Sequence, residues 1–161
     1  MIDAAKLRSE FLTVAQLAGL RLADKDVVVE THPAPHQAPK PLPKGTCAVY
    51  VYGTPTQCLK VGKAGPKSQA RYTSQHYQPD SAPSTLARSL LITKAEFGIP
   101  EAIDASTIGD WIKQNTYRIN ILLSSDAGVH ALNLLEAFVQ CKLDPRFEGF
   151  PSQRKQVSSN A

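Results

Sequence analysis

The chain has 161 residues, 42% of them hydrophobic and 20% charged, a composition typical of one globular domain that buries its own core. Its three cysteines form no CxxC spacing, and no apolar run is long enough to cross a membrane, so we expect reduced thiols in a cytoplasmic protein without membrane contacts. From Thr31 to Pro79 the chain has no Asp or Glu but six Lys or Arg residues. This concentration of charge favours a surface that binds polyanions, and a solubilising patch explains it about equally well.

The N-terminal part begins with an amphipathic helix over residues 2–20, followed by a short strand at residues 27–29. We interpret residues 1–31 as an N-terminal extension of the main domain. Residues 32–44 contain five prolines, which exclude a helix and favour an extended strap on the surface. A plain linker is the favoured interpretation of this strap, and a ligand for a proline-binding partner is the alternative.

Residues 45–64 predict a β-hairpin that turns at Pro55. If the hairpin is symmetric about this proline, Tyr50 lies opposite Lys60, with their Cβ atoms about 5 Å apart. This pair is expected on a sheet face that the core does not use. The opposite face of the hairpin is expected to hold the apolar residues Val49, Val51, Leu59 and Val61.

The rest of the chain alternates helices with one further strand. Periodicity predicts a basic helix over 66–77, helices over 84–96 and 107–113, a buried strand over 117–124 and an apolar helix over 129–143. We therefore expect an α/β (α+β) fold in which a small, mainly antiparallel three-stranded sheet is flanked by helices. Residues 45–150 form the expected main domain, and residues 151–161 a flexible tail.

Glu136 lies at the border of the apolar stripe on the last predicted helix. A partly buried carboxylate at this position needs a cation, a set of hydrogen-bond donors or a metal as its partner. An ordinary glutamate at the edge of an amphipathic helix is the commoner alternative.

Arg71 and His76 lie on the basic helix, where five residues of separation place their side chains about 140° apart. They converge on one ligand only if the helix ends or tightens near Gln75. Arginine suits bidentate phosphate binding, and histidine donates a hydrogen bond to a phosphate or relays a proton.

The order of these residues resembles that of the GIY-YIG nuclease superfamily over residues 45–149. The matching segments are Ala48-Val49-Tyr50 and Lys60-Val61-Gly62, followed by Arg71, His76 and Glu136. The chain departs from the family pattern at Ala48, usually glycine, and at Lys60, where many members have tyrosine and some restriction-enzyme-like members have lysine. His76 follows Arg71 by five residues, whereas the family's equivalent usually follows by four.

The resemblance implies metal-dependent endonucleolytic cleavage of DNA. Tyr50 would act as the general base, and Lys60 and Arg71 would stabilise charge, the ammonium also lowering the pKa of the phenol. His76 is a further catalytic candidate, and Glu136 would hold one Mg²⁺ or Mn²⁺. The nucleic-acid contacts are assigned to Lys63, Lys67 and Arg71. RNA as substrate, a dimeric state and the biological role stay open, and the alternative is a catalytically inactive nucleic-acid-binding module with the same fold.

Overall fold

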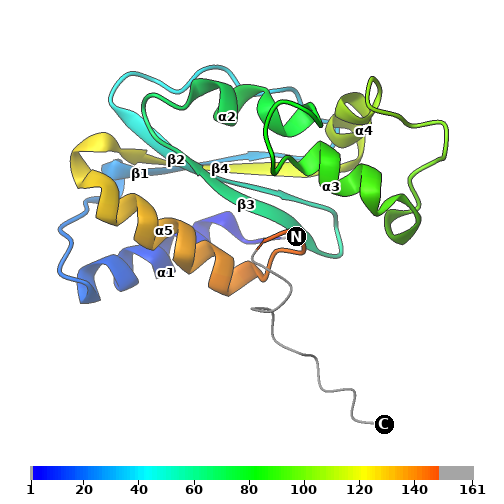
Figure 1. Cartoon of the computed structure of the whole chain (residues 1–161). Helices are drawn as coiled ribbons and strands as arrows, with labels where there is room; N and C mark the ends of the chain where they lie inside the picture. The colour runs from blue at the N-terminus through cyan, green and yellow to red at the C-terminus, as the bar shows by residue number, and fades with distance from the viewer. Residues whose placement is uncertain (1, 149–161) are drawn as a thin grey trace, which may run out of the picture.

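The computed structural model describes residues 2–148 and shows an α+β fold, with a four-stranded antiparallel sheet between two layers of helices (Figure 1). The strands are β1 (Val27–His32), β2 (Thr46–Gly53), β3 (Cys58–Ala64) and β4 (Tyr117–Ser124), in the order β1-β4-β2-β3. The prediction of three strands was one short. The strand expected within the N-terminal extension continues to His32 and pairs with β4 along its whole length.

The helices cover both faces of the sheet (Figure 1). One face carries α1 (Ala4–Leu17) and α5 (Gly128–Leu143), and the other carries α2 (Gln69–Thr73), α3 (Leu86–Ile92) and α4 (Ile108–Asn115). Short 3₁₀ turns occupy Asp24–Asp26, Gln75–Tyr77, Lys94–Phe97 and Ser125–Ala127. None of the helices within residues 2–148 combines the length and the apolar character needed to cross a membrane.

Each face of the sheet has its own hydrophobic core. Val49 and Val51 are core residues, as expected, and they pack with residues of α1 and α5. Tyr50 lies in the second core, under α2 and α3, and is fully buried, so the expectation that its face is free of core contacts was wrong. Leu59 also packs in this second core instead of beside Val61, because the hairpin is irregular near its turn.

The hairpin register differs from the symmetric one. Tyr50 pairs with Gly62, and Lys60 pairs with Tyr52, so the predicted pairing of Tyr50 with Lys60 was wrong. There are two causes: next to the turn, Gly53 pairs with Cys58, which centres the turn after Pro55, and a register shift between Tyr52 and Gly53 moves the pairing by one further residue. A shift of this kind depends on backbone conformation that the residue pattern did not reveal.

The proline-rich segment between β1 and β2 (residues 33–45, called the strap below) is fastened to the helices beside it. The backbone N–H of His36 donates to the carbonyl oxygen of Lys113 over 2.9 Å. The backbone N–H of Leu42 donates to the side-chain oxygen of Gln69 over 2.8 Å, and Leu42 itself is buried. Two hydrogen bonds to separate helices thus hold the strap across the sheet face that carries α2 and α4.

Candidate active site

Arg71 and His76 both contact the hydroxyl group of Tyr50. The Nε–H of Arg71 donates to the tyrosine oxygen over 3.1 Å, and Nε2 of His76 lies 2.6 Å from the same atom. The two side chains converge because α2 ends at Thr73 and a 3₁₀ turn follows at Gln75–Tyr77. This is the tightening that the sequence required for convergence.

The hydrogen bonds of His76 fix its tautomer. Nδ1 accepts from the backbone N–H of Leu86 over 3.3 Å, so the proton of a neutral ring lies on Nε2 and is donated to Tyr50. Burial, with the positive charges of Lys60 and Arg71, lowers the pKa of His76 to about 3. His76 is therefore a neutral hydrogen-bond donor at physiological pH.

The Tyr50 oxygen thus accepts two hydrogen bonds, and both stabilise the phenolate more than the phenol. Burial acts in the opposite direction and raises the pKa of Tyr50 above its ordinary value, although the charge and hydrogen bond of Arg71 lower it. The predicted register had implied that Lys60 lowers the pKa of Tyr50. In the structure the largest lowering effect on this pKa comes from Arg71. Tyr50 is a phenol at neutral pH, and additional positive charge at the site would favour its ionisation.

Gly62 gives the Tyr50 ring its position. A Cβ atom at residue 62 would lie 2.5 Å from the hydroxyl oxygen of Tyr50 and 2.7 Å from the ring carbon that bears it. The ring therefore lies directly across the β3 backbone, in space that only glycine leaves open. This close approach is what aligns the hydroxyl with Arg71 and His76.

Lys60 is buried on the same face, where its ammonium has two partners. Its Nζ lies 3.1 Å from a carboxylate oxygen of Glu148 and 3.2 Å from the hydroxyl oxygen of Ser84. Glu148 reaches this position because the backbone N–H of Phe147 donates to the carbonyl oxygen of Leu59 over 2.9 Å, which holds the segment after α5 against β3. Sequence reasoning missed Glu148, since it follows the last predicted helix and belongs to no periodic pattern.

Glu136 is half-buried on α5, and its partner is a cation from the neighbouring strand. The Nζ of Lys63 donates to Oε2 of Glu136 over 2.6 Å and to the side-chain oxygen of Asn133 over 2.8 Å. Lys63, predicted as a nucleic-acid contact, is therefore engaged in an ion pair. The sequence predicted that Glu136 has a cation, hydrogen-bond donors or a metal as its partner. In the structure the partner is a cation, the ammonium of Lys63.

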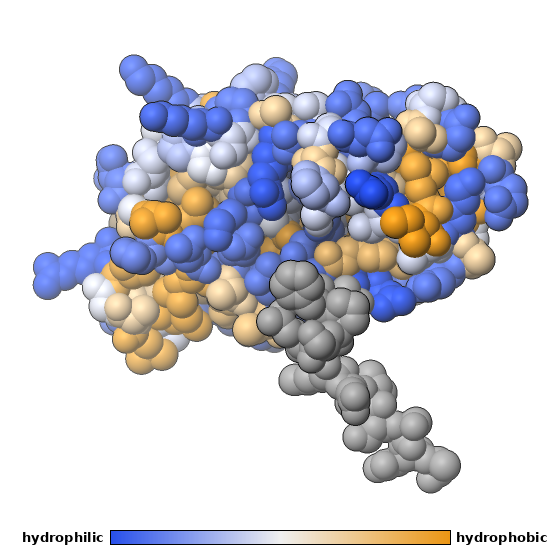
Figure 2. Space-filling model, viewed as in Figure 1, coloured by the Kyte–Doolittle hydropathy of each residue, from blue (hydrophilic) through white to orange (hydrophobic). Residues whose placement is uncertain are grey.

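These two ion pairs lie within electrostatic reach of Arg71. Burial tends to lower the pKa of Arg71, but its interaction with Tyr50 and the charges of Glu136 and Glu148 raise it above its ordinary value. Burial also raises the pKa of Glu148, an effect that Lys60 opposes and Glu136 reinforces. Charged groups from β3, α2, α5 and the C-terminal segment thus gather along the β3 edge, and Figure 2 shows hydrophilic side chains between α2 and α5.

The predicted residues accordingly fall into three groups. Tyr50, Arg71 and His76 are in direct contact, and Lys60 and Glu136 each sit in an ion pair beside them. The last two predicted residues, Lys63 and Lys67, differ: Lys63 is bound to Glu136, and Lys67 is exposed before α2. Arg71 itself is exposed, so the cluster is reachable from solvent through its guanidinium.

The metal-binding capacity of the site rests on carboxylates. Among residues 2–148, no group of three or more His, Cys, Asp or Glu side chains is arranged to hold a metal ion. Glu136 and Glu148 supply hard oxygen ligands, and Mg²⁺ needs only one or two carboxylates because it retains several waters. This donor set fits Mg²⁺ or Mn²⁺, provided that the ion competes with the ammonium of Lys63 for Glu136 and with that of Lys60 for Glu148.

The guanidinium of Arg118 packs against three tyrosine rings of the second core, and this residue was not identified from the sequence. It is fully buried, and its guanidinium carbon lies 5.3 Å from the ring centroid of Tyr50, 4.9 Å from that of Tyr52 and 4.8 Å from that of Tyr72. It also donates to the hydroxyl of Tyr52 and to the backbone carbonyl of Tyr72. The only signal in the sequence was an arginine within a strand of mostly apolar residues.

The fold and these contacts define an α+β protein with a tyrosine–arginine–histidine cluster beside the edge of its sheet. Comparison of the chain with protein-family models, with curated proteins and with solved structures found no match. The chemistry of the cluster is therefore the basis for assigning a function.

Proposed function

We propose that this protein is a metal-dependent endonuclease of the GIY-YIG type that hydrolyses DNA phosphodiester bonds. The observation that carries the proposal is the Tyr50 hydroxyl, which accepts hydrogen bonds from both Arg71 and His76 beside the carboxylates of Glu136 and Glu148. A tyrosine surrounded by donors, an exposed guanidinium and nearby oxygen ligands supply the groups that phosphodiester hydrolysis needs.

In this proposal Tyr50 reacts from its phenolate form, which additional positive charge at the site favours, and becomes a phenol when it takes the proton of the attacking water. The two N–H donors hold its oxygen in place and stabilise the phenolate from which it reacts. Arg71 binds the scissile phosphate and stabilises the negative charge of the transition state, and Lys60 adds a second positive charge. Glu136, with Glu148 as a neighbouring carboxylate, would hold a Mg²⁺ or Mn²⁺ ion, which when bound supplies stabilisation of the leaving oxygen.

DNA binding is assigned to the basic side of the site. Lys67 and Arg71 are exposed, and Lys63 is partly exposed in its ion pair with Glu136. Neutralisation of phosphates by such side chains makes affinity fall as salt concentration rises. DNA is preferred to RNA as substrate on the family resemblance alone.

A catalytically inactive nucleic-acid-binding module is the second candidate. One observation favours it: the carboxylates of Glu136 and Glu148 are each paired with a lysine, at 2.6 and 3.1 Å. A module of this kind would bind nucleic acid in a salt-sensitive manner and would need no metal.

Plasmid cleavage in Mg²⁺ or Mn²⁺ separates the two candidates. We expect the protein to nick or linearise plasmid and the Glu136→Ala variant to lose this activity. The control variant Glu101→Ala changes an exposed carboxylate outside the cluster and should retain the activity. Absence of cleavage above the Glu136→Ala level on supercoiled, branched and single-stranded DNA would refute the nuclease. Metal-independent, salt-sensitive binding in the same samples would then support the binding module.

A further inference from the structure

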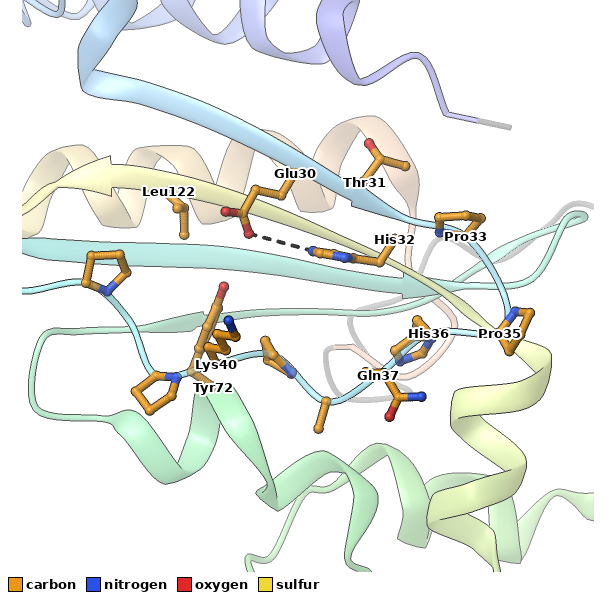
Figure 3. A pocket seen from close by; sticks show the side chains of 14 residues that line it. Glu30, Thr31, His32, Pro33, Pro35, His36, Gln37, Lys40, Tyr72 and Leu122 are labelled. Atoms are coloured by element: carbon orange, nitrogen blue, oxygen red, sulfur yellow. Dashed lines mark ion pairs between the residues drawn. The ribbon is translucent and has the colours of Figure 1, made fainter.

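A pocket of about 610 Å³ lies between the strap and the sheet (Figure 3), and Tyr50 is not among the residues that line it. Its volume is within the range of small-molecule sites. Tyr72 from α2 and Leu122 from β4 line it, together with the strap prolines Pro35, Pro39, Pro41 and Pro43. The walls are therefore mostly apolar, and the hydrogen bonds that fasten the strap form the pocket in advance of any ligand.

The pocket holds a carboxylate and an imidazole from β1, beside the polar strap residues His36 and Gln37. Glu30 and His32 alternate on the strand and face the strap, with 3.6 Å between Oε2 of Glu30 and Nε2 of His32 (Figure 3). Both side chains are partly exposed, so a ligand in the pocket can reach them. Lys40 of the strap adds an ammonium to the lining.

Asn120 orients the carboxylate and the imidazole from behind. The Nε–H of Arg118 donates to the side-chain oxygen of Asn120 over 2.7 Å, and because arginine has only donors, the amide NH₂ group must face β1. This NH₂ group lies 3.2 Å from Oε2 of Glu30 and 3.1 Å from Nε2 of His32. His32 therefore accepts at Nε2, which leaves the proton of its neutral ring on Nδ1.

We infer that this pocket binds an unpaired guanine base of the nucleic-acid substrate. Guanine carries two adjacent N–H donors, at N1 and N2, that match one carboxylate, and its neighbouring O6 accepts from a donor such as the ring N–H of His32. Adenine, cytosine and thymine have no two adjacent donors on this edge. The flat faces of the base fit the apolar walls made by the strap prolines, beside the buried ring of Tyr72.

Charge also favours a nucleotide over a cationic protein side chain. Glu30 attracts donors, but Lys40 lines the same pocket, and the strap on which it lies contains no acidic residue. An ammonium beside a base-binding carboxylate suits the phosphate of the same nucleotide. A lysine or arginine side chain from a partner would meet repulsion from Lys40.

The pocket connects to the cluster around Tyr50 through α2. Tyr72 follows Arg71 in the chain, and its ring centroid lies 6.4 Å from that of Tyr50. Gln69 of the same helix binds the strap at Leu42. The inference thus rests on the proposed function and deepens it, because it gives the strand held by Arg71 a base preference.

Binding of the single-stranded pentanucleotides d(TTXTT) to the full chain tests the inference without metal and without cleavage. Isothermal titration calorimetry would compare guanine, adenine, cytosine and thymine at X. We expect the guanine strand to bind about tenfold more tightly, as for a good bidentate base contact. Hypoxanthine, which lacks the N2 amino group, should lose most of this preference, and 7-deazaguanine, altered only on the opposite edge, should keep it.

Glu30→Gln should abolish the guanine preference, and Glu101→Gln, the same change at an exposed carboxylate, should leave it intact. Equal affinities for all strands, a preference that survives Glu30→Gln, or hypoxanthine binding as tightly as guanine would overturn the inference. Tighter binding of an arginine-containing pentapeptide than of d(TTGTT) would also overturn it, in favour of a protein partner.

The outcome is independent of catalysis. Tyr50→Phe should lose plasmid cleavage and keep the guanine preference, because the Tyr50 hydroxyl is not part of the pocket lining. A protein that cleaves DNA without any guanine preference would refute the pocket assignment alone. A protein that prefers guanine but never cleaves would refute the nuclease and leave the pocket assigned.

Discussion

Nε2 of His76 lies 2.6 Å from the hydroxyl oxygen of Tyr50, across the gap between the turn after α2 and the middle of β2. Because the ring is neutral and its other nitrogen accepts from Leu86, this contact is a hydrogen bond donated to the tyrosine. The histidine therefore acts on Tyr50 as a neutral hydrogen-bond donor and is not an imidazolium acid at neutral pH. In the proposed mechanism its role is to hold the Tyr50 oxygen and stabilise the phenolate form, and not to protonate a phosphate.

Tyr50→Phe should abolish metal-dependent plasmid cleavage, with a loss of at least about 100-fold, the lower range for a general base. The substitution keeps the ring and removes only the oxygen. Stability should fall by about 1–3 kcal/mol in urea denaturation, because the N–H groups of Arg71 and His76 lose their shared acceptor.

Tyr117→Phe is the matched control for that substitution. Tyr117 begins β4 and lies over Gly53, much as Tyr50 lies over Gly62, but it packs against the core of the opposite sheet face, the one that carries α1 and α5. Cleavage should be unchanged in this variant. Equal losses in both tyrosine variants would show that packing, and not the Tyr50 hydroxyl, sets the activity.

Gly62→Ala should inactivate the protein by displacing Tyr50. The new methyl group would lie 2.5 Å from the hydroxyl oxygen, so the ring must move away from Arg71 and His76. Overpacking of this kind costs about 1–3 kcal/mol, measurable by thermal or urea denaturation.

Gly65→Ala provides the comparison, since a Cβ atom at residue 65 meets no atom within 4 Å. Its stability should change by less than about 1 kcal/mol and its cleavage should persist. A fully active Gly62→Ala protein would contradict the position that we assign to the tyrosine.

The sequence predicted the elements better than their pairing. The strand at Tyr117–Ser124 has the predicted bounds, and α5 differs from its predicted helix by one residue, because long runs of apolar periodicity mark such elements. The partner of Tyr50 in the hairpin was wrong, since a register shift next to Gly53 leaves no mark in the alternation of side chains. The predicted tail from residue 151 lies outside the described residues.

The candidate site was predictable only where contacts are local. Arg71 and His76 were expected to meet if their helix tightened near Gln75, and it does. The contacts of Glu148 with Lys60 and of Arg118 with three tyrosine rings join residues far apart in the chain. Such contacts depend on how the chain returns to the sheet, which periodicity does not encode.

Lys63→Met should increase the affinity of the Glu136 carboxylate for Mn²⁺, because it removes the ammonium that competes with the metal. We expect about a tenfold lower dissociation constant, equivalent to roughly 1.4 kcal/mol of charge interaction. Electron paramagnetic resonance of free Mn²⁺, in the absence of DNA, measures this directly.

Lys142→Met removes the ammonium of a separate ion pair, with Glu10 at 3.0 Å, and should leave Mn²⁺ binding as it is in the unmodified protein. Glu136→Gln should weaken Mn²⁺ binding in either background. Undiminished binding in Glu136→Gln would exclude this carboxylate as the ligand.

His76 should make stability depend on pH in the acidic range. Folding lowers the pKa of its imidazole from 6.5 to about 3, mainly through burial. Between these values the unfolded chain binds a proton that the folded protein does not, so the free energy of unfolding falls as pH falls from 6.5 towards 3. In urea denaturation the unmodified protein should lose stability faster than His76→Gln, by up to about 1.4 kcal/mol per pH unit. Because the pKa of His36 is also lowered in both proteins, only the difference between their curves reports His76. Parallel curves would mean that the imidazole accepts its proton without leaving Tyr50.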